Sequence, residues 1–98
     1  MLRKYPTTYI MASERNGTLY VGVTSDPVKR IFEHKESLIE GFTEKYKCHS
    51  LVFFECHQTM MSAIEREKKI KRLSRRKKIE LIQAMNSDWK DLYSSIVW

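Results

Sequence analysis

The first quarter of the chain carries two short segments that are rich in β-branched and aromatic residues and are separated by a turn signal. The segments are residues 7–12 and 18–24, and residues 14–17 lie between them. Asn16 and Gly17 supply the positive φ angles that a tight hairpin needs. The pattern therefore predicts two antiparallel strands joined as a β-hairpin.

A first helix is predicted to begin at Pro27 and to run to about Ile39. Ser25 or Asp26 can cap its N-terminus, and proline suits the first helical position, where a missing N–H costs nothing. Apolar residues recur on one face of this helix, namely Val28, Ile31, Phe32, Leu38 and Ile39. Gly41 follows as the expected helix stop.

The residue pattern in the middle of the chain predicts one more strand and then a second helix. Residues 51–56 form the strand, and Thr59 or Ser62 can begin a helix that runs through Arg72.

Two more segments complete the predicted fold. Ser74 can cap a third helix that runs to about Met85, and residues 86–88 form a break. A final amphipathic segment then follows, with the apolar residues Trp89, Leu92, Tyr93 and Ile96. The order of elements predicts a small α/β fold of the α+β type, with helices packed on a mainly antiparallel sheet.

Length and composition limit the class of protein. With 98 residues and 11.7 kDa, the chain is expected to form one domain over residues 1–98, because a core rarely divides below roughly 100–150 residues. Hydrophobic residues make up 42% and charged residues 31%, which argues against both a membrane-embedded and a disordered chain. No signal peptide or membrane span is recognised, and two cysteines are too few for a disulfide scaffold. We expect a soluble, cytoplasmic protein with no membrane partner.

The positive charge is concentrated in one segment. Residues 66–78 contain nine basic residues and one acid, a net charge of +8, whereas the rest of the chain contains nine basic and eleven acidic residues, a net charge of −2. Such a run matches a phosphate backbone, on which Lys and Arg release condensed counterions. A solvated helix surface is the alternative, and an acidic membrane surface is a weaker one. The candidate nucleic-acid-binding residues are Lys68, Lys71, Arg72, Arg75, Arg76, Lys77 and Lys78.

An acidic residue interrupts the apolar stripe of the second predicted helix. Helical periodicity places Glu67 in the middle of an arc formed by Met60, Ala63, Ile64, Ile70 and Lys71. A carboxylate on a core-facing stripe is costly unless it is paired, hydrogen-bonded or metal-bound. Glu67 is therefore either a buried glutamate paired with an arginine or a functional acid.

Other reactive groups are few. The chain has no cluster of carboxylates of the kind that two-metal phosphodiesterases need. Cys48 and Cys56 lack the close spacing of structural zinc ligands, so we expect both to be reduced and free of zinc. The remaining constellation is Tyr9 and Tyr20 on the hairpin, Arg30 and His34 on the first helix, and Glu67. Ordinary packing is the alternative for each of these residues.

This constellation resembles the GIY-YIG nuclease superfamily, particularly its small single-domain bacterial members. The first family motif is matched by residues 7–9, of which only Tyr9 is retained, and the second by residues 20–22. The family carries an arginine ten residues after the second tyrosine, here Arg30, and often His or Tyr four residues later, here His34.

The resemblance continues through the rest of the chain. The family's Ala-x-x-x-Glu-x-x-Ile-Lys pattern is matched by residues 63–71, in which the glutamate is Glu67. The tail pattern Asn-x-x-Trp-x-Asp-Leu is matched by residues 86–92. The asparagine that often follows the glutamate by about a dozen residues in family nucleases corresponds to Ile79, and Asn86 is the nearest candidate for its supporting role.

The resemblance implies a three-stranded antiparallel sheet flanked by helices and a hydrolase that cleaves phosphodiester bonds with one divalent metal, Mg²⁺ or Mn²⁺. Glu67 would be the metal ligand, and Arg30 would bind the scissile phosphate. Tyr9 or Tyr20 would activate the attacking water, and His34 would accept or relay its proton. We expect these five side chains to converge on one side of the sheet.

The leading hypothesis is a metal-dependent endonuclease that acts on DNA, including branched or damaged DNA. The first alternative is a nucleic-acid-binding module of the same fold that cleaves poorly or not at all. The second is a protein whose basic face docks an acidic protein partner.

Overall fold

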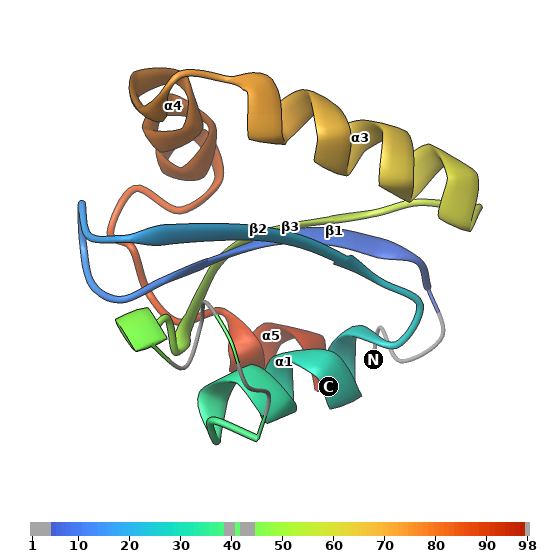
Figure 1. Ribbon diagram of the computed structural model, residues 1–98, viewed down its shortest axis with the longest axis horizontal. Helices are drawn as coiled ribbons and strands as arrows, with labels where there is room; N and C mark the ends of the chain where they lie inside the picture. The colour runs from blue at the N-terminus through green and yellow to red at the C-terminus, as the bar shows by residue number, and fades with distance from the viewer. Residues whose placement is uncertain (1–4, 39–40, 42–44, 98) are drawn as a thin grey trace.

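A computed structural model of the chain describes residues 5–38, 41 and 45–97. The elements, in chain order, are β1 (Thr7–Ala12), β2 (Leu19–Thr24), α1 (Pro27–Lys35), β3 (Ser50–Cys56), α3 (Met60–Arg72), α4 (Arg75–Met85) and α5 (Tyr93–Ile96). Figure 1 shows the sheet between two layers of helix, with α3 and α4 on one face and α1 and α5 on the other. The predicted α+β fold is confirmed.

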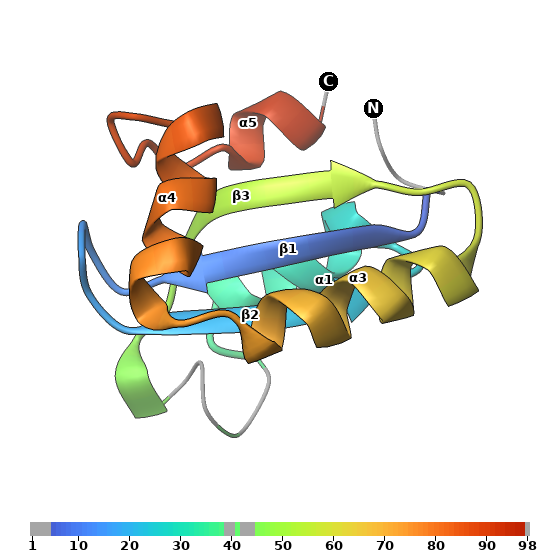
Figure 2. The same cartoon turned by 90° about the horizontal axis from the view of Figure 1, so that it is seen from above.

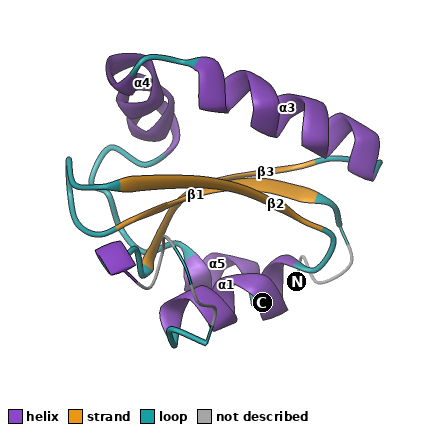
Figure 3. Ribbon diagram, in the orientation of Figure 1, coloured by secondary structure: helices purple, strands orange, loops and turns teal. Residues whose placement is uncertain are grey.

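The sheet has the strand order β2-β1-β3, and both pairings are antiparallel. β1 is therefore the central strand, and all six of its residues are buried because helices cover both faces (Figure 3). β2 forms one edge of the sheet and β3 forms the other.

The predicted turn over residues 14–17 is confirmed, but Gly17 does not take the positive φ expected for it. The backbone N–H of Gly17 donates to the Glu14 carbonyl at 2.9 Å, and Asn16 takes a left-handed φ of 57°. The Arg75 guanidinium donates from Nη2 to the carbonyl oxygens of Asn16 and Gly17, both at 2.6 Å. This contact ties the start of α4 to the hairpin.

Side-chain alternation along the strands divides the core into two clusters. Beneath α3 and α4 lie Ile10, Ala12, Val21, Val52, Phe53, Ile70, Ile82 and Trp89. On the face of α1 and α5 lie Tyr9, Met11, Ile31, Cys48, Leu51 and Ile96. Successive residues of β1 thus belong to opposite clusters. Tyr9 is buried on the α1 side, while its neighbour Ile10 packs in the cluster beneath α3 and α4.

Each predicted helix start is confirmed by a side-chain cap. An Asp26 carboxylate oxygen accepts from an α1 backbone N–H at 3.3 Å, Thr59 Oγ1 accepts from α3 at 3.1 Å, and Ser74 Oγ accepts from α4 at 3.2 Å. A cap of this kind stabilises a helix by about 1 kcal/mol.

The end of α1 differs from the prediction. The helix ends at Lys35, and Ser37 takes the left-handed conformation with a φ of 54°. Ile39 lies outside the described residues, and Gly41 follows well after the helix end, so it is not the stop. Leu38 and Phe32 are exposed, since the buried face of α1 is formed by Pro27, Ile31 and His34.

The final segment also differs from the prediction of an amphipathic segment, because its apolar residues do not share one face. Trp89 belongs to the cluster beneath α3 and α4, whereas Ile96 belongs to the opposite cluster. Between them the chain passes the β3 edge, where the Leu92 N–H donates to the Leu51 carbonyl at 2.7 Å and the Leu51 N–H donates to Asp91 Oδ1 at 3.2 Å. Figure 2 shows α4 and α5 at this side of the sheet.

Asn86 holds the turn that starts this crossing. Its buried amide nitrogen donates to the carbonyls of Val52 at 3.2 Å and Lys90 at 2.8 Å, and its Oδ1 accepts from the Lys90 N–H at 3.0 Å. Both the nitrogen and the oxygen of the Asn86 amide are therefore hydrogen-bonded at the β3 edge, away from β2. The supporting catalytic role expected for Asn86 does not fit this position.

No helix in the described part of the chain is long and apolar enough to cross a membrane.

Replacing Asn86 with aspartate should destabilise the fold. The carboxylate keeps the shape of the amide but cannot donate to Val52 or Lys90, so two carbonyls lose their donor. We expect the free energy of unfolding to fall by about 2–3 kcal/mol in urea titrations. Replacing the exposed neighbour Ser87 with alanine is the control and should change it by less than about 0.5 kcal/mol. Equal effects from both variants would contradict a structural role for the amide.

Candidate functional site

A close contact between Tyr9 and Gly22 determines where the tyrosine ring lies. The two residues are cross-strand partners in the β1–β2 register. A Cβ at position 22 would lie 2.5 Å from both Cζ and the phenol oxygen of Tyr9, so the ring occupies the place of a side chain on β2. The requirement is for space, because the φ of Gly22 is not in the left-handed region. The missing side chain thus lets Tyr9, from the central strand, extend over the edge strand.

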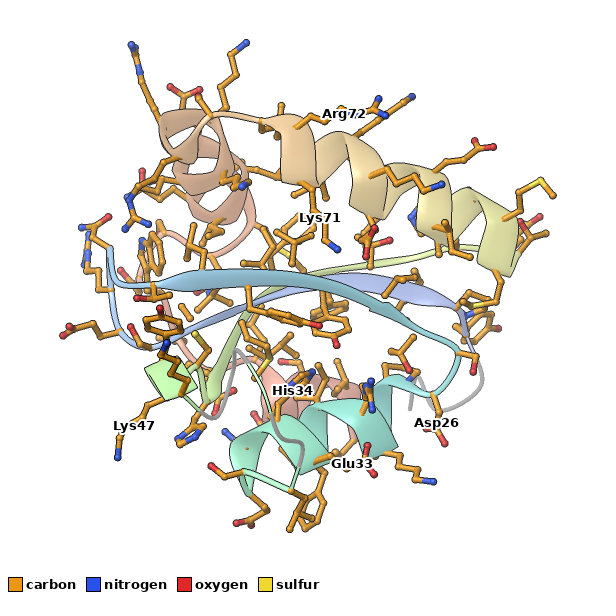
Figure 4. All side chains as sticks on the ribbon, in the orientation of Figure 1. Asp26, Glu33, His34, Lys47, Lys71 and Arg72 are labelled. Carbon is orange, nitrogen blue, oxygen red and sulfur yellow. The ribbon has the colours of Figure 1, made fainter. Side chains whose placement is uncertain are left out.

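Tyr9, Tyr20 and His34 form one aromatic cluster on the α1 face of the sheet. The Tyr9 hydroxyl lies 2.8 Å from His34 Nε2, a hydrogen bond between two buried groups. Ring centroids are 6.4 Å apart for the two tyrosines, 5.6 Å for Tyr9 and His34, and 5.3 Å for Tyr20 and His34. His34 points from α1 toward the sheet (Figure 4).

The ionisation of Tyr9 responds to the surrounding charges. Burial raises the pKa of the phenol above its usual value, and Tyr20 raises it further. Arg30 opposes this through its charge and a hydrogen bond to the phenol, whereas the charge of Glu67 adds to the rise. Burial dominates, so the phenol is neutral. The same balance shows that Arg30 and Glu67 both lie close enough to act on Tyr9.

His34 is a neutral imidazole in this environment. Burial lowers its pKa to about 4, the nearby Arg30 charge lowers it further, and Glu33 opposes both. At neutral pH one ring nitrogen is therefore an acceptor. A neutral histidine beside a neutral tyrosine can accept a proton, as a base must.

Arg30 lies at the rim of an open depression. The depression has a volume of about 360 Å³ and is lined by residues 23–26 after β2, by Lys29, Arg30 and Glu33 of α1, and by Met60 of α3. The Arg30 guanidinium pairs with Glu33 at 3.5 Å, and its side chain is 45% exposed. It can therefore reach both the buried phenol and a ligand in the depression. Nothing in the sequence pattern indicated Glu33 or Met60 as lining residues.

Glu67 approaches from the opposite helical layer. It lies on α3 between the buried Ala63 and Ile70, as its place in the apolar stripe predicted, and its side chain is only 14% exposed. Its Oε2 pairs with Lys71 Nζ at 3.0 Å, not with an arginine. Ile64, by contrast, is 37% exposed and does not belong to the buried stripe.

The prediction that the five side chains share one side of the sheet is wrong for Glu67. α3 covers the face opposite to α1 and packs over β2 and β1 (Figures 1 and 2). Because β2 is an edge strand, groups from both faces can approach each other around it. Tyr9, Tyr20 and His34 thus lie together on the α1 side, and Glu67 lies in the other helical layer, close enough for its charge to affect the phenol of Tyr9.

The donor set at this edge fits a hard cation with few protein ligands. No group of three or more His, Cys, Asp or Glu side chains that could hold a metal ion occurs in the described residues. A single carboxylate, Glu67, is compatible with Mg²⁺, which keeps most of its water ligands.

The basic residues continue outward from Glu67 along α3 and α4. Arg72 points away from the sheet, whereas Lys71 extends toward it (Figure 4). Arg76 pairs with Glu80 at 3.4 Å on the exposed face of α4. Lys68 and Lys77 are also exposed. These cations are exposed on α3 and α4, the helical layer that also carries Glu67.

Two of the basic residues differ from the expected phosphate contacts. Lys78 is half-buried. Arg75 is turned toward the hairpin carbonyls, so its guanidinium serves the fold and is poorly placed for a phosphate.

The two cysteines lie near opposite ends of β3 and form no disulfide with each other. Cys48 is buried, and this burial raises the pKa of its thiol, whereas Cys56 is exposed.

Comparisons with known proteins identify relatives of this chain. Residues 5–80 match the family described as the GIY-YIG catalytic domain. A UPF0213 protein of Staphylococcus saprophyticus is 37% identical over 68 residues, which are 69% of this chain and 83% of that protein. A UPF0213 protein of Haloquadratum walsbyi is 33% identical over 82 residues, which are 84% of this chain and 91% of that protein.

A solved structure shares the fold. The solution NMR structure of a UPF0213 protein from Bacillus halodurans has a TM-score of 0.56 to this chain and 27% sequence identity, covering 88% of this chain and 90% of that one.

Replacing Gly22 with alanine should destabilise the protein through the Tyr9 ring. The added methyl group meets buried ring atoms that have no room to move, and we expect a cost of about 1–3 kcal/mol in urea unfolding. The same substitution in a Tyr9→Leu background should cost clearly less, because the ring is gone. An equal cost in both backgrounds would show that some other contact requires the glycine.

His34 should make stability depend on pH in a defined window. The imidazole binds a proton near pH 6.5 when unfolded but only near pH 4 when folded, so the unfolded state takes up more protons between these values. Lowering the pH through this window should remove about 3 kcal/mol of stability. His34→Gln should flatten this part of the profile. A parallel profile for His34→Gln and the parent would contradict the buried neutral state.

Proposed function

The chain belongs to the GIY-YIG catalytic-domain family, and we propose that it is a metal-dependent endonuclease. It would hydrolyse phosphodiester bonds in DNA and act as one domain over residues 1–98. The observation that supports the proposal is that charged groups from both helical layers act on Tyr9. Arg30 reaches the phenol from one helical layer, and the charge of Glu67 acts on it from the other. A phosphate-binding cation and a carboxylate thereby flank a proton-transfer group.

Arg30 would bind the scissile phosphate. Its guanidinium stands at the rim of the depression, and its donors can form paired hydrogen bonds to phosphate oxygens. As negative charge develops on these oxygens in the transition state, a fixed cation stabilises it. The ion pair with Glu33 holds the guanidinium at this rim before a phosphate arrives.

Tyr9 and His34 would remove a proton from the attacking water. With the histidine proton on Nδ1, the phenol donates to Nε2 across the 2.8 Å hydrogen bond. The phenol oxygen can then accept a proton from water while its own proton passes to the imidazole. This route avoids the isolated phenolate that burial disfavours. Tyr20, whose ring packs against both, would keep the pair in place.

Glu67 would hold the divalent cation, Mg²⁺ or Mn²⁺, that nucleases of this family typically use. Such an ion supplies charge stabilisation at phosphate oxygens and lowers the pKa of bound water. The protein contributes a single carboxylate, held on α3 between two buried residues. This placement would hold the carboxylate in a fixed position, which favours binding of the ion.

The exposed cations of α3 and α4 would guide the DNA strand to this edge. They are sequence-independent contacts, because Lys and Arg side chains on a helix surface neutralise phosphates along the backbone. The surface begins beside Glu67 on the same helix, so a bound strand would pass the site.

Replacing Glu67 with glutamine should separate cleavage from binding. Losing the carboxylate should lower the rate of nicking of supercoiled and branched DNA in Mg²⁺ or Mn²⁺ by about two orders of magnitude or more, since the described residues contain no group of three or more possible ligands that could hold the ion in its place. DNA affinity should hold or increase, because a negative charge near the phosphate is removed.

Glu65→Gln is the matched control, because Glu65 lies on the same helix but is exposed. It should cleave like the parent. If the parent binds DNA in a salt-dependent way but never cleaves it with metal, the protein is a binding module. If it does not bind DNA at all, the basic face serves a protein partner.

A further inference from the structure

The carboxylate of Glu67 has a cation from its own helix beside it. Lys71 follows Glu67 by one helical turn, and its ammonium lies 3.0 Å from Oε2. The two side chains differ in exposure, since that of Glu67 is 14% exposed and that of Lys71 is 54% exposed. The carboxylate is thus mostly buried, whereas the side chain that carries the cation is about half exposed.

This pair differs from a surface ion pair of the usual kind. An exposed pair of this spacing contributes little, because water screens both charges. A mostly buried carboxylate, by contrast, needs a compensating charge. Lys71 extends toward the sheet, whereas the next residue, Arg72, points away from it (Figure 4). The direction of Lys71 indicates that its ammonium compensates Glu67.

From this geometry we infer that Lys71 is the resident counter-ion of Glu67 and competes with a divalent cation for the same carboxylate. The inference rests on the proposed function, in which Glu67 binds that cation. Lys71 occupies Oε2, and Oε1 belongs to the same small group, so a cation at either oxygen meets the ammonium charge at close range. Binding of the cation therefore requires Lys71 to turn away.

The exposure of Lys71 makes this exchange feasible. Its side chain lies at the solvent boundary, so the ammonium can regain its hydration when it leaves the carboxylate. Glu67 has no such freedom, because Ala63 and Ile70 on either side of it are fully buried. The lysine thus sets the concentration of cation that the site needs and keeps the carboxylate compensated when no cation is present.

The test measures Mn²⁺ binding to the full chain without DNA, using electron paramagnetic resonance of the free ion. Lys71→Met should bind Mn²⁺ about three- to tenfold more tightly than the parent, because the competing charge is gone. Lys69→Met is the matched control. It removes the same charge from the same helix, but residues two positions apart do not share a face, so its affinity should stay near that of the parent.

Glu67→Gln separates the competition by Lys71 from the metal-ligand role of Glu67. If it loses Mn²⁺ binding while Lys71→Met binds no more tightly than the parent, the competition is wrong but the metal-ligand role stands. If Glu67→Gln binds Mn²⁺ like the parent, Glu67 is not the ligand, and both the inference and this part of the proposed function fail. Lys71→Gln is measured beside the methionine variant, with circular dichroism as the check on folding. Loss of folding in both Lys71 variants would make the pair purely structural and would also overturn the inference.

Discussion

The site depends on the absence of a side chain at position 22. Because Gly22 leaves room over the edge strand, the Tyr9 ring can extend from the central strand over β2, with its hydroxyl buried against His34. The hydrogen bond to His34 and the effect of Arg30 on the phenol both follow from this position. A larger residue at this point would move the phenol and separate these groups.

The edge strand explains how two helical layers contribute to one site. A sheet covered on both faces separates groups on α1 from groups on α3, and the two core clusters share no residue. Arg30 from one layer and Glu67 from the other nevertheless both act on the phenol of Tyr9. The opposite edge, at β3, is occupied differently, since the C-terminal segment crosses it and Asn86 and Asp91 bond to its backbone.

The basic residues of the segment 66–78 have different roles in the structure. The basic segment has an excess of cations, yet the structure uses them unequally. Arg75 fastens the hairpin turn, Lys71 compensates Glu67, and Arg72 faces solvent. A count of positive residues therefore overstates the number available for phosphates. Lys71 and Arg72 point to different sides of α3, and Arg75 lies on α4.

The sequence by itself determined the strands, the helix starts and the place of Glu67 on a buried stripe. These features depend on local alternation, capping residues and helical period, which involve only neighbours along the chain. Tertiary structure alone decided that Glu67 lies across the sheet from Tyr9, that α1 ends at Lys35, and that Asn86 serves the β3 edge. These outcomes depend on which face a helix covers and on contacts between residues far apart in the chain, and a local pattern carries no information about either.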